Sequence, residues 1–281
     1  MTSALIEEHI AKGSYYEALQ LYRTLYARSI VKEAKHAALV GELEKGAGTM
    51  LRAGESNCAI ELLELLFTAY DKAHVAPSDE RVAALQQLFE QLPPHKYTDN
   101  KCQALLKHVA AWSKAPQCEH GAPALHNLFA RKFADAADLM QANAHYLRGN
   151  DAAAHVALIR RWADEAAPSE RDLLFARAVL QALCFDQLYA ASELHAAALA
   201  DARIADSPLT HAIGFVVSCC ERDAGPLFTE LRSRYAASFA RDPAFAQYLD
   251  AVGKRFFAIQ PAAAPPNMMT MLQQMLSGGG R

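Results

Sequence analysis

The sequence predicts an all-α protein, a right-handed α-solenoid of stacked antiparallel helix pairs that is tetratricopeptide-like but has degenerate repeats. Apolar residues recur at the three- and four-residue spacing of one helix face through most of the chain, and no segment alternates as a strand does. Alanine, the best helix former, supplies much of the 52% hydrophobic fraction. Only 9% of residues are aromatic, which predicts a shallow, distributed core. We expect roughly 13 or 14 helices on this pattern.

The clearest helix is expected at residues 14–30. Its apolar face consists of Tyr15, Ala18, Leu19, Tyr22, Leu25, Tyr26 and Ile30. Gly13 ends the helix before it, because glycine readily takes the left-handed conformation of a helix C-terminus. Ser14 and Glu17 have the spacing of a capping box, which predicts a well-marked start.

The same pattern predicts the rest of the chain to be helical. Further helices are expected at about 33–53, 56–73, 78–91, 98–113, 123–131, 134–148, 151–166, 169–184, 186–201, 208–221, 224–238, 243–258 and 267–276. Pro93–Pro94 stops one of them, and Ser207–Pro208 and Asp242–Pro243 place a capping residue before a proline. Most connections are short, so successive helices should be antiparallel neighbours.

Weak repeats accompany these helices. Gly13, Tyr15, Ala18 and Tyr22 match the second helix of a tetratricopeptide unit, and weaker echoes occur at Gly54, Ala59 and Leu63 and at Phe133, Ala136 and Met140. The first two copies lie about 41 residues apart, longer than the ~34 of a true unit. Small alanines allow close helix approach, and stacked pairs of this kind expose extended surfaces to partners.

We predict one solenoid over residues 1–260, followed by a different kind of segment. The solenoid has an N-terminal half at about 1–148 and a C-terminal half at about 149–260, with no internal linker. Residues 261–266 contain three prolines among alanines and predict a stiff spacer. The rest of 261–281 is a Met-rich flexible tail that ends in glycines.

Composition excludes several classes of function. The formal net charge of −3 argues against nucleic-acid binding, which needs clustered Lys and Arg. No signal peptide and no run of ~18 apolar residues is found, so we expect a cytoplasmic protein without direct membrane insertion. The six cysteines form no C-x-x-C pair and predict small buried side chains in a reducing compartment.

No catalytic motif was found. G-x-S-x-G, H-E-x-x-H and EF-hand patterns are absent. Residues 41–49 resemble a phosphate loop, but the lysine precedes the second glycine and no strand leads in. Cys118 and His120 share a loop, and His126 lies beyond it. A metal site would need more ligands close by, so a surface loop with incidental polar residues is the better interpretation. The sequence therefore predicts a non-enzymatic binding protein with no cofactor and no metal.

Several blocks resemble the Golgi to ER traffic protein four family. They are the run from Gly13 to Leu25 (GSYYEALQLYRTL), Leu125–Leu128, Ala178–Cys184, Asp242–Pro243, Tyr248–Leu249, Gly253, Phe256–Phe257, and the proline, Met/Leu and glycine tail. The resemblance spans nearly the whole chain in order, and its first and last blocks are the specific ones.

This resemblance implies an α-solenoid scaffold for the delivery of tail-anchored membrane proteins to the endoplasmic reticulum. The N-terminal half would dock the targeting ATPase of that pathway. The C-terminal half would hold the N-terminal segment of a ubiquitin-like protein, through which a co-chaperone could join. The scaffold itself would have no catalytic activity.

The resemblance also implies site residues. Leu19, Tyr22 and Arg23 match the ATPase-binding face, where Arg23 suits an acidic partner, and Glu61 would face a basic one. An ordinary solvated charge is the alternative for Arg23 and Glu61, whereas Tyr15 and Ala18 are read as core. For the ubiquitin-like partner the candidates are Phe215, Val216, Tyr248, Phe256 and Phe257, with packing inside the chain as the alternative.

Four alternatives stay open at this point. Family members often carry an insertion before the helix that starts near Pro208, but 200–207 is short here, so that interface could be built differently. The Met-rich tail could hold hydrophobic segments, or it could pack on the last helix or stay disordered. A generic tetratricopeptide-like subunit of another assembly is the alternative function, and an all-helical enzyme would need an apolar pocket with convergent ionisable groups.

Overall fold

The structure, a computed structural model, describes residues 2–204 and 206–259. This part of the chain contains 15 α-helices, three short 3-10 helices and no strand. The one β-type pairing among these residues is an isolated bridge between Ala115 and Cys118. The all-α prediction is confirmed, and the chain divides into two compact units, Met1–Trp162 (unit 1) and Ala163–Arg281 (unit 2).

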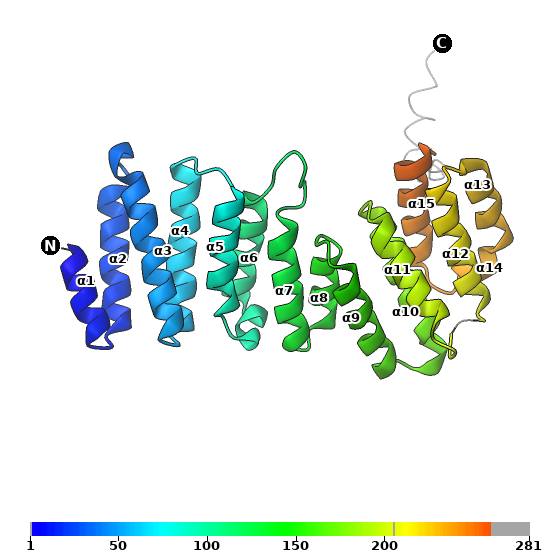
Figure 1. The fold of residues 1–281 in the computed structure, drawn as a ribbon, viewed down its shortest axis with the longest axis horizontal. Coiled ribbons are helices and arrows are strands. Elements are labelled where there is room, and N and C mark those ends of the chain that lie inside the picture. Colours follow the sequence, from blue (N-terminus) through cyan, green and yellow to red (C-terminus); the bar gives the residue numbers. More distant parts are fainter. Residues whose placement is uncertain (1, 205, 260–281) are drawn as a thin grey trace, which may run out of the picture. The chain divides into compact units, whose positions relative to one another are not determined.

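Unit 1 is a row of helices that stand side by side (Figure 1). Its elements are α1 (Thr2–Ala11), α2 (Tyr15–Ser29), η1 (Glu33–Lys35), α3 (His36–Arg52), α4 (Ser56–Lys72), α5 (Asp79–Glu90), η2 (Pro94–Thr98), α6 (Asn100–Trp112), α7 (Pro123–Asp135), α8 (Leu139–Tyr146) and most of α9 (Ala152–Glu165). Helices α2, α4 and α6 contact one another in succession, and so do α3, α5 and α7. Unit 1 is therefore built from two rows of helices.

The α1–α2 turn shows how local sequence places helix ends. Gly13 adopts φ +72° and donates to Ile10 O, while the Ser14 amide donates to His9 O. These two bonds form a Schellman motif, as the predicted role of Gly13 requires. The predicted capping box is wrong, because the Ser14 side chain makes no capping hydrogen bond. Ser14 has ψ 65° as it closes the preceding helix, instead of the extended backbone typical of a capping residue.

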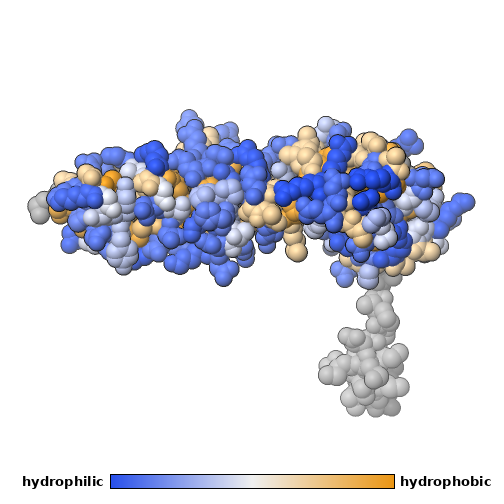
Figure 2. Space-filling view, turned by 90° about the horizontal axis from the view of Figure 1, so that it is seen from below, coloured by the Kyte–Doolittle hydropathy of each residue, from blue (hydrophilic) through white to orange (hydrophobic). Residues whose placement is uncertain are grey.

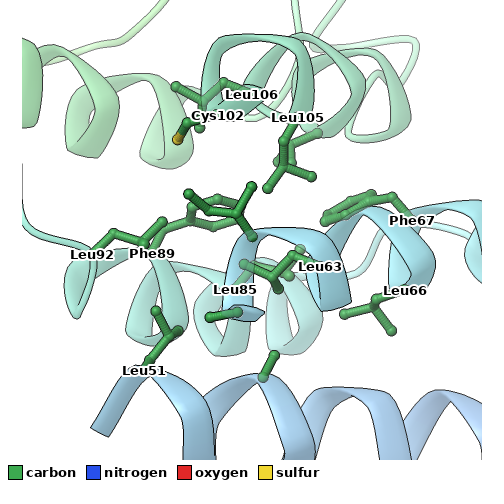
Figure 3. Close-up of a cluster of buried hydrophobic side chains, with 14 of the residues drawn as sticks. Leu51, Leu63, Leu66, Phe67, Leu85, Phe89, Leu92, Cys102, Leu105 and Leu106 are labelled. Carbon is green, nitrogen blue, oxygen red and sulfur yellow. The ribbon is translucent and has the colours of Figure 1, made fainter. Parts of the chain in front are cut away.

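The core of unit 1 lies between the two rows. Figure 3 shows leucines and phenylalanines of α3–α6 that meet from both sides, including Leu63, Phe67, Leu85, Phe89 and Leu105. A continuous cluster of buried apolar side chains extends from α1 to α9, which agrees with a distributed core. Burying each large side chain contributes roughly 1.5–3 kcal/mol, so the helix stack depends on many modest contributions.

Unit 2 packs its helices around α10. Its elements are η3 (Pro168–Glu170), α10 (Arg171–Cys184), α11 (Leu188–Leu199), α12 (Pro208–Glu221), α13 (Gly225–Arg234), α14 (Ala236–Phe239) and α15 (Ala244–Phe257). Helix α10 contacts α11, α12 and α15. Phe175, Phe228 and Phe245 are among the fully buried side chains.

Two predicted helices differ from those observed. The helix expected at 224–238 is split at Tyr235, whose φ of −104° and ψ of 21° leave the helical region, so that α14 turns back onto α12 and buries Phe239. The helix expected at 134–148 starts later, at Leu139. Ala137 adopts φ +61°, and the Asp138 carboxylate accepts a hydrogen bond from the Gln141 amide as the cap of α8.

Further predictions concern the phosphate-loop pattern, the cysteines, membrane-spanning helices and the C-terminal segment. Residues 41–49 lie inside α3, so they form no phosphate loop. All six cysteines are free, and Cys102, Cys219 and Cys220 are buried. No helix among residues 2–204 and 206–259 is long and apolar enough to cross a membrane. The predicted spacer and the helix expected at 267–276 lie outside the described residues.

Candidate protein-binding surfaces

Three charged side chains link α2, α4 and α6 on the surface of unit 1. The Arg23 guanidinium on α2 donates to Glu61 on α4, and the Lys101 ammonium on α6 lies 3.2 Å from the other Glu61 carboxylate oxygen. The structure thus brings together two of the predicted ATPase-facing residues, Arg23 and Glu61, across 38 residues of sequence. Lys101 was missed, because nothing in its local sequence marks it as their neighbour.

Leu19 and Tyr22 have a different position. Their exposed fractions are 1% and 3%, so in this structure neither side chain can contact a partner directly. Helix periodicity turns them inward with Ala18, which is fully buried as predicted. A Cβ on Gly46 would lie 2.5 Å from Cζ of Tyr22, so α3 provides the space for that ring. Burial raises the pKa of Tyr22 to about 12.

The exposed face of α2 is marked instead by Tyr16 and Arg23, two turns apart. Tyr16 is 64% exposed, an unusual state for a large aromatic side chain. Gln20 lies between them, and its amide nitrogen is buried without a hydrogen-bond partner in the structure. Such unsatisfied donors are rare and require an explanation. Tyr16, Arg23, Glu61 and Lys101 are called the N-terminal surface below.

Of the five residues predicted for the ubiquitin-like partner, the structure exposes one strongly. Val216 is fully buried, which is a correction, because its phase on α12 points it inward. Tyr248 is half-buried, and its hydroxyl accepts a hydrogen bond from the Gln181 amide at 3.0 Å. Phe256 and Phe257 are half-buried, and the Phe257 ring lies 5.0 Å from Phe228. Packing inside the chain therefore accounts for most of these four side chains.

Phe215 is 50% exposed on α12 and lies between two hollows. One, of about 560 Å³, lies towards α11 and includes Leu199. The other, of about 710 Å³, lies towards α13 and includes Leu227 and Tyr235. Leu199 and Leu227 are also exposed, and sequence periodicity missed both. Phe215, Leu199, Leu227 and Tyr235 are called the Phe215 surface. The face in Figure 2 is largely hydrophilic, with apolar areas interspersed among the hydrophilic ones.

Two ion pairs between exposed arginines and buried carboxylates fix the frame behind this surface. Arg177 on α10 donates to the Asp242 carboxylate at 2.6 and 3.0 Å, and Asp242 also accepts from the Ala244 amide at the start of α15. The Asp242–Pro243 block thus has a structural role. Asp172 accepts from Ser207 at 2.6 Å and pairs with Arg241. Ser207, the last residue of the short 200–207 segment, is thereby held against α10.

No metal site was found among the described residues. They contain no group of three His, Cys, Asp or Glu side chains that could hold a metal ion. His126 is buried in α7, with its Nδ1 2.9 Å from Nδ1 of His145 and its Nε2 3.0 Å from the His120 carbonyl. Burial lowers the pKa of His126 to about 4 and that of His145 to about 3. Both rings therefore stay neutral at pH 7.

Comparisons with known proteins decide the family. The model of the family "Golgi to ER traffic protein 4" matches residues 33–277. A Golgi to ER traffic protein 4 homolog of Dictyostelium discoideum is 30% identical over 282 residues, covering 99% of this chain and 89% of the relative. The chain belongs to the Golgi to ER traffic protein 4 family. The homolog of Homo sapiens is 28% identical over 259 residues, covering 90% of this chain and 78% of the relative.

A solved structure agrees with this family assignment. The crystal structure of C. therm. Get4 matches the fold with a TM-score of 0.80 at 21% sequence identity, covering 99% of this chain and 95% of that one. At this identity the likeness concerns the fold alone, and it supports the all-helical solenoid class. The family match begins at residue 33, so the Gly13–Leu25 block lies before it, within the range covered by the Dictyostelium homolog.

Proposed function

We propose that the chain is a non-enzymatic cytosolic scaffold that bridges the targeting ATPase and the ubiquitin-like protein of the tail-anchored pathway, so that tail-anchored proteins are delivered to the endoplasmic reticulum. Family membership supports a role in Golgi-to-ER traffic. The observation that carries the bridging proposal is the presence of one exposed, chemically distinct surface on each unit. The N-terminal surface is charged, whereas the Phe215 surface is apolar.

The N-terminal surface suits a partner with both acidic and basic groups. Arg23 and Glu61 are partly exposed, and surface ion pairs of this kind contribute only ~0–1 kcal/mol. Arg23 can therefore exchange Glu61 for a carboxylate of the ATPase at little cost. Glu61 then becomes available to a basic group, while Lys101 stays beside it. Leu19 and Tyr22, buried beneath the N-terminal surface, hold α2 in place.

The Phe215 surface suits the ubiquitin-like partner. Aromatic anchors in pockets contribute most to protein interfaces, and Phe215 is the largest exposed apolar side chain of α12. Tyr248, Phe256 and Phe257 support the helices behind it. Since the 200–207 segment is short, we assign this partner to the helices α11–α13 alone.

The decisive experiment measures co-elution of the full chain with the ATPase in ATP at low salt. Arg23→Glu should weaken the complex at least tenfold, because it places a carboxylate where one is bound. Arg131→Glu is the matched control: Arg131 is an exposed, ion-paired arginine on α7 and should leave binding unchanged. Absence of co-elution for the unaltered chain, or equal loss in both variants, would overturn the assignment of the N-terminal surface.

A further inference from the structure

The groove between α12 and α13 in unit 2 has an apolar floor that the described residues leave uncovered. Phe215, Cys219, Leu227, Leu231 and Tyr235 contribute side chains to it, and Leu227 is 59% exposed. The charged side chains that line it, Arg222, Glu230 and Arg234, are all exposed. An occupant of this groove therefore needs apolar side chains along one face and needs no charge of its own.

The described chain ends against α13, the helix that forms one side of this groove. The Ile259 amide donates to the Gly253 carbonyl at 3.0 Å, which ends α15 next to Phe228 of α13. A Cβ on Gly225 would lie 3.3 Å from Cβ of Phe257, and Gly225 directly follows the groove residue Ala224. The chain thus leaves α15 at the start of α13, where the groove begins.

The following 22 residues have the length and pattern of an occupant. Residues 260–267 can span up to about 26–29 Å, while α13 is only about 15 Å long. Next, Met268, Met271, Leu272 and Met275 have the i, i+3, i+4, i+7 spacing of a helix that binds in a groove. Thr270, Gln273, Gln274 and Ser277 repeat this spacing with polar residues, and no charged residue occurs in 260–280.

From these observations we infer that the Met/Leu segment 268–276 binds in cis to the α12–α13 groove, with Leu272 and the flanking methionines packed against Leu227 and Phe215. Unbranched methionine side chains adapt to an irregular groove. The spacer 260–267 sets how far the segment can extend from the end of α15. Because the segment is tethered to the same chain, its effective concentration near the groove is high. This contact covers part of the Phe215 surface, so on the function proposed above a partner must displace the segment.

Photo-crosslinking in the full chain, with no partner present, tests the contact. We place p-benzoylphenylalanine at position 272 on the apolar stripe or, as the matched control, at position 274 on the polar stripe. Position 272 should crosslink within one chain to peptides of 215–235, and position 274 should do so much less. The yield should not depend on protein concentration. Equal yields at both positions, attachment elsewhere, or a yield that rises with concentration would overturn the inference.

A groove variant completes the test. Leu227→Glu should lower the yield from position 272 about tenfold, because the segment would bury an unpaired carboxylate. Leu5→Glu, at an exposed leucine of α1 in unit 1, should leave the yield unchanged. Circular dichroism of both variants reports whether the fold persists. Since no partner is present, failure of the ubiquitin-like docking cannot affect this result, and an unchanged yield in Leu227→Glu would contradict the inferred contact.

Discussion

The two units expose different chemistry over similar helical frames. Unit 1 presents a charged surface, in which Arg23, Glu61 and Lys101 link three helices above a continuous core. Unit 2 presents apolar side chains, led by Phe215, above a frame fixed by the buried carboxylates of Asp172 and Asp242. Charged surfaces mainly set how fast a complex forms and how strongly its formation depends on salt. Buried aromatic anchors mainly set how long the complex lasts. The difference predicts that salt weakens binding of the ATPase more than binding of the ubiquitin-like partner.

The largest expected effect separates the units by acid stability. Burial lowers the pKa of His126, His145 and His155, all in unit 1, to about 4, 3 and 4. Each lies below the unfolded value of about 6.5, so the unfolded chain binds extra protons as pH falls below 6.5. Stability present above pH 6.5 is then lost as the pH falls towards these folded-state values, about 2 kcal/mol per histidine by pH 5.

Hydrogen exchange of the full chain at pH 7.5 and pH 5.5 measures this loss unit by unit. Unit 1 should lose more protection than the described part of unit 2, where His195 is the one histidine whose pKa burial lowers. His145→Phe should reduce the difference, because a phenyl ring can retain the stacking on Phe133 without titrating. Equal losses in the two units would contradict the prediction.

A paired glycine substitution tests the packing beneath the N-terminal surface. In Gly46→Ala the new Cβ would lie 2.5 Å from the Tyr22 ring and 2.9 Å from Leu62, so we expect a loss of about 1–3 kcal/mol in urea unfolding. Gly41→Ala, on the same helix α3, meets nothing within 4 Å and should be neutral or stabilising by up to about 1 kcal/mol. Similar effects at both positions would show that α2 does not depend on this contact.

Salt should distinguish the two binding surfaces. Raising ionic strength from about 0.05 to 0.5 M should weaken ATPase binding on the order of tenfold, because exposed charges more than a Debye length apart become screened. Binding of the ubiquitin-like partner to the Phe215 surface should change much less. Calorimetry with each partner at both salt concentrations measures this. A salt response that is larger for the ubiquitin-like partner would reverse the assignment.

The smallest effect is expected at Lys101. Lys101→Ala removes one exposed ion pair with Glu61, which should change the free energy of unfolding by less than about 0.5 kcal/mol. If the N-terminal surface binds the ATPase, the same variant should alter that affinity more than it alters stability. Urea unfolding and calorimetry on one preparation give both values, and a large loss of stability would make Lys101 a structural residue.

The sequence by itself determined the helical class, most helix bounds and the apolar face of α2. Periodicity placed Ala18 in the core, and the Gly13 and Ser207 signals marked helix ends, because these features act within one or two turns of the chain. The resemblance in sequence likewise gave the family. The capping box at Ser14 failed because the Schellman motif before it fixed the same residue's backbone.

Only the tertiary structure decided which candidate site residues reach the surface. Leu19, Tyr22 and Val216 were predicted to face partners but lie in the core, since neighbouring helices cover them. Arg23 and Glu61 meet Lys101 only because α2, α4 and α6 form one row. Exposure and contact between distant helices depend on packing, which local spacing does not encode. For this reason the N-terminal surface and the Phe215 surface became distinct only once the helices were in place.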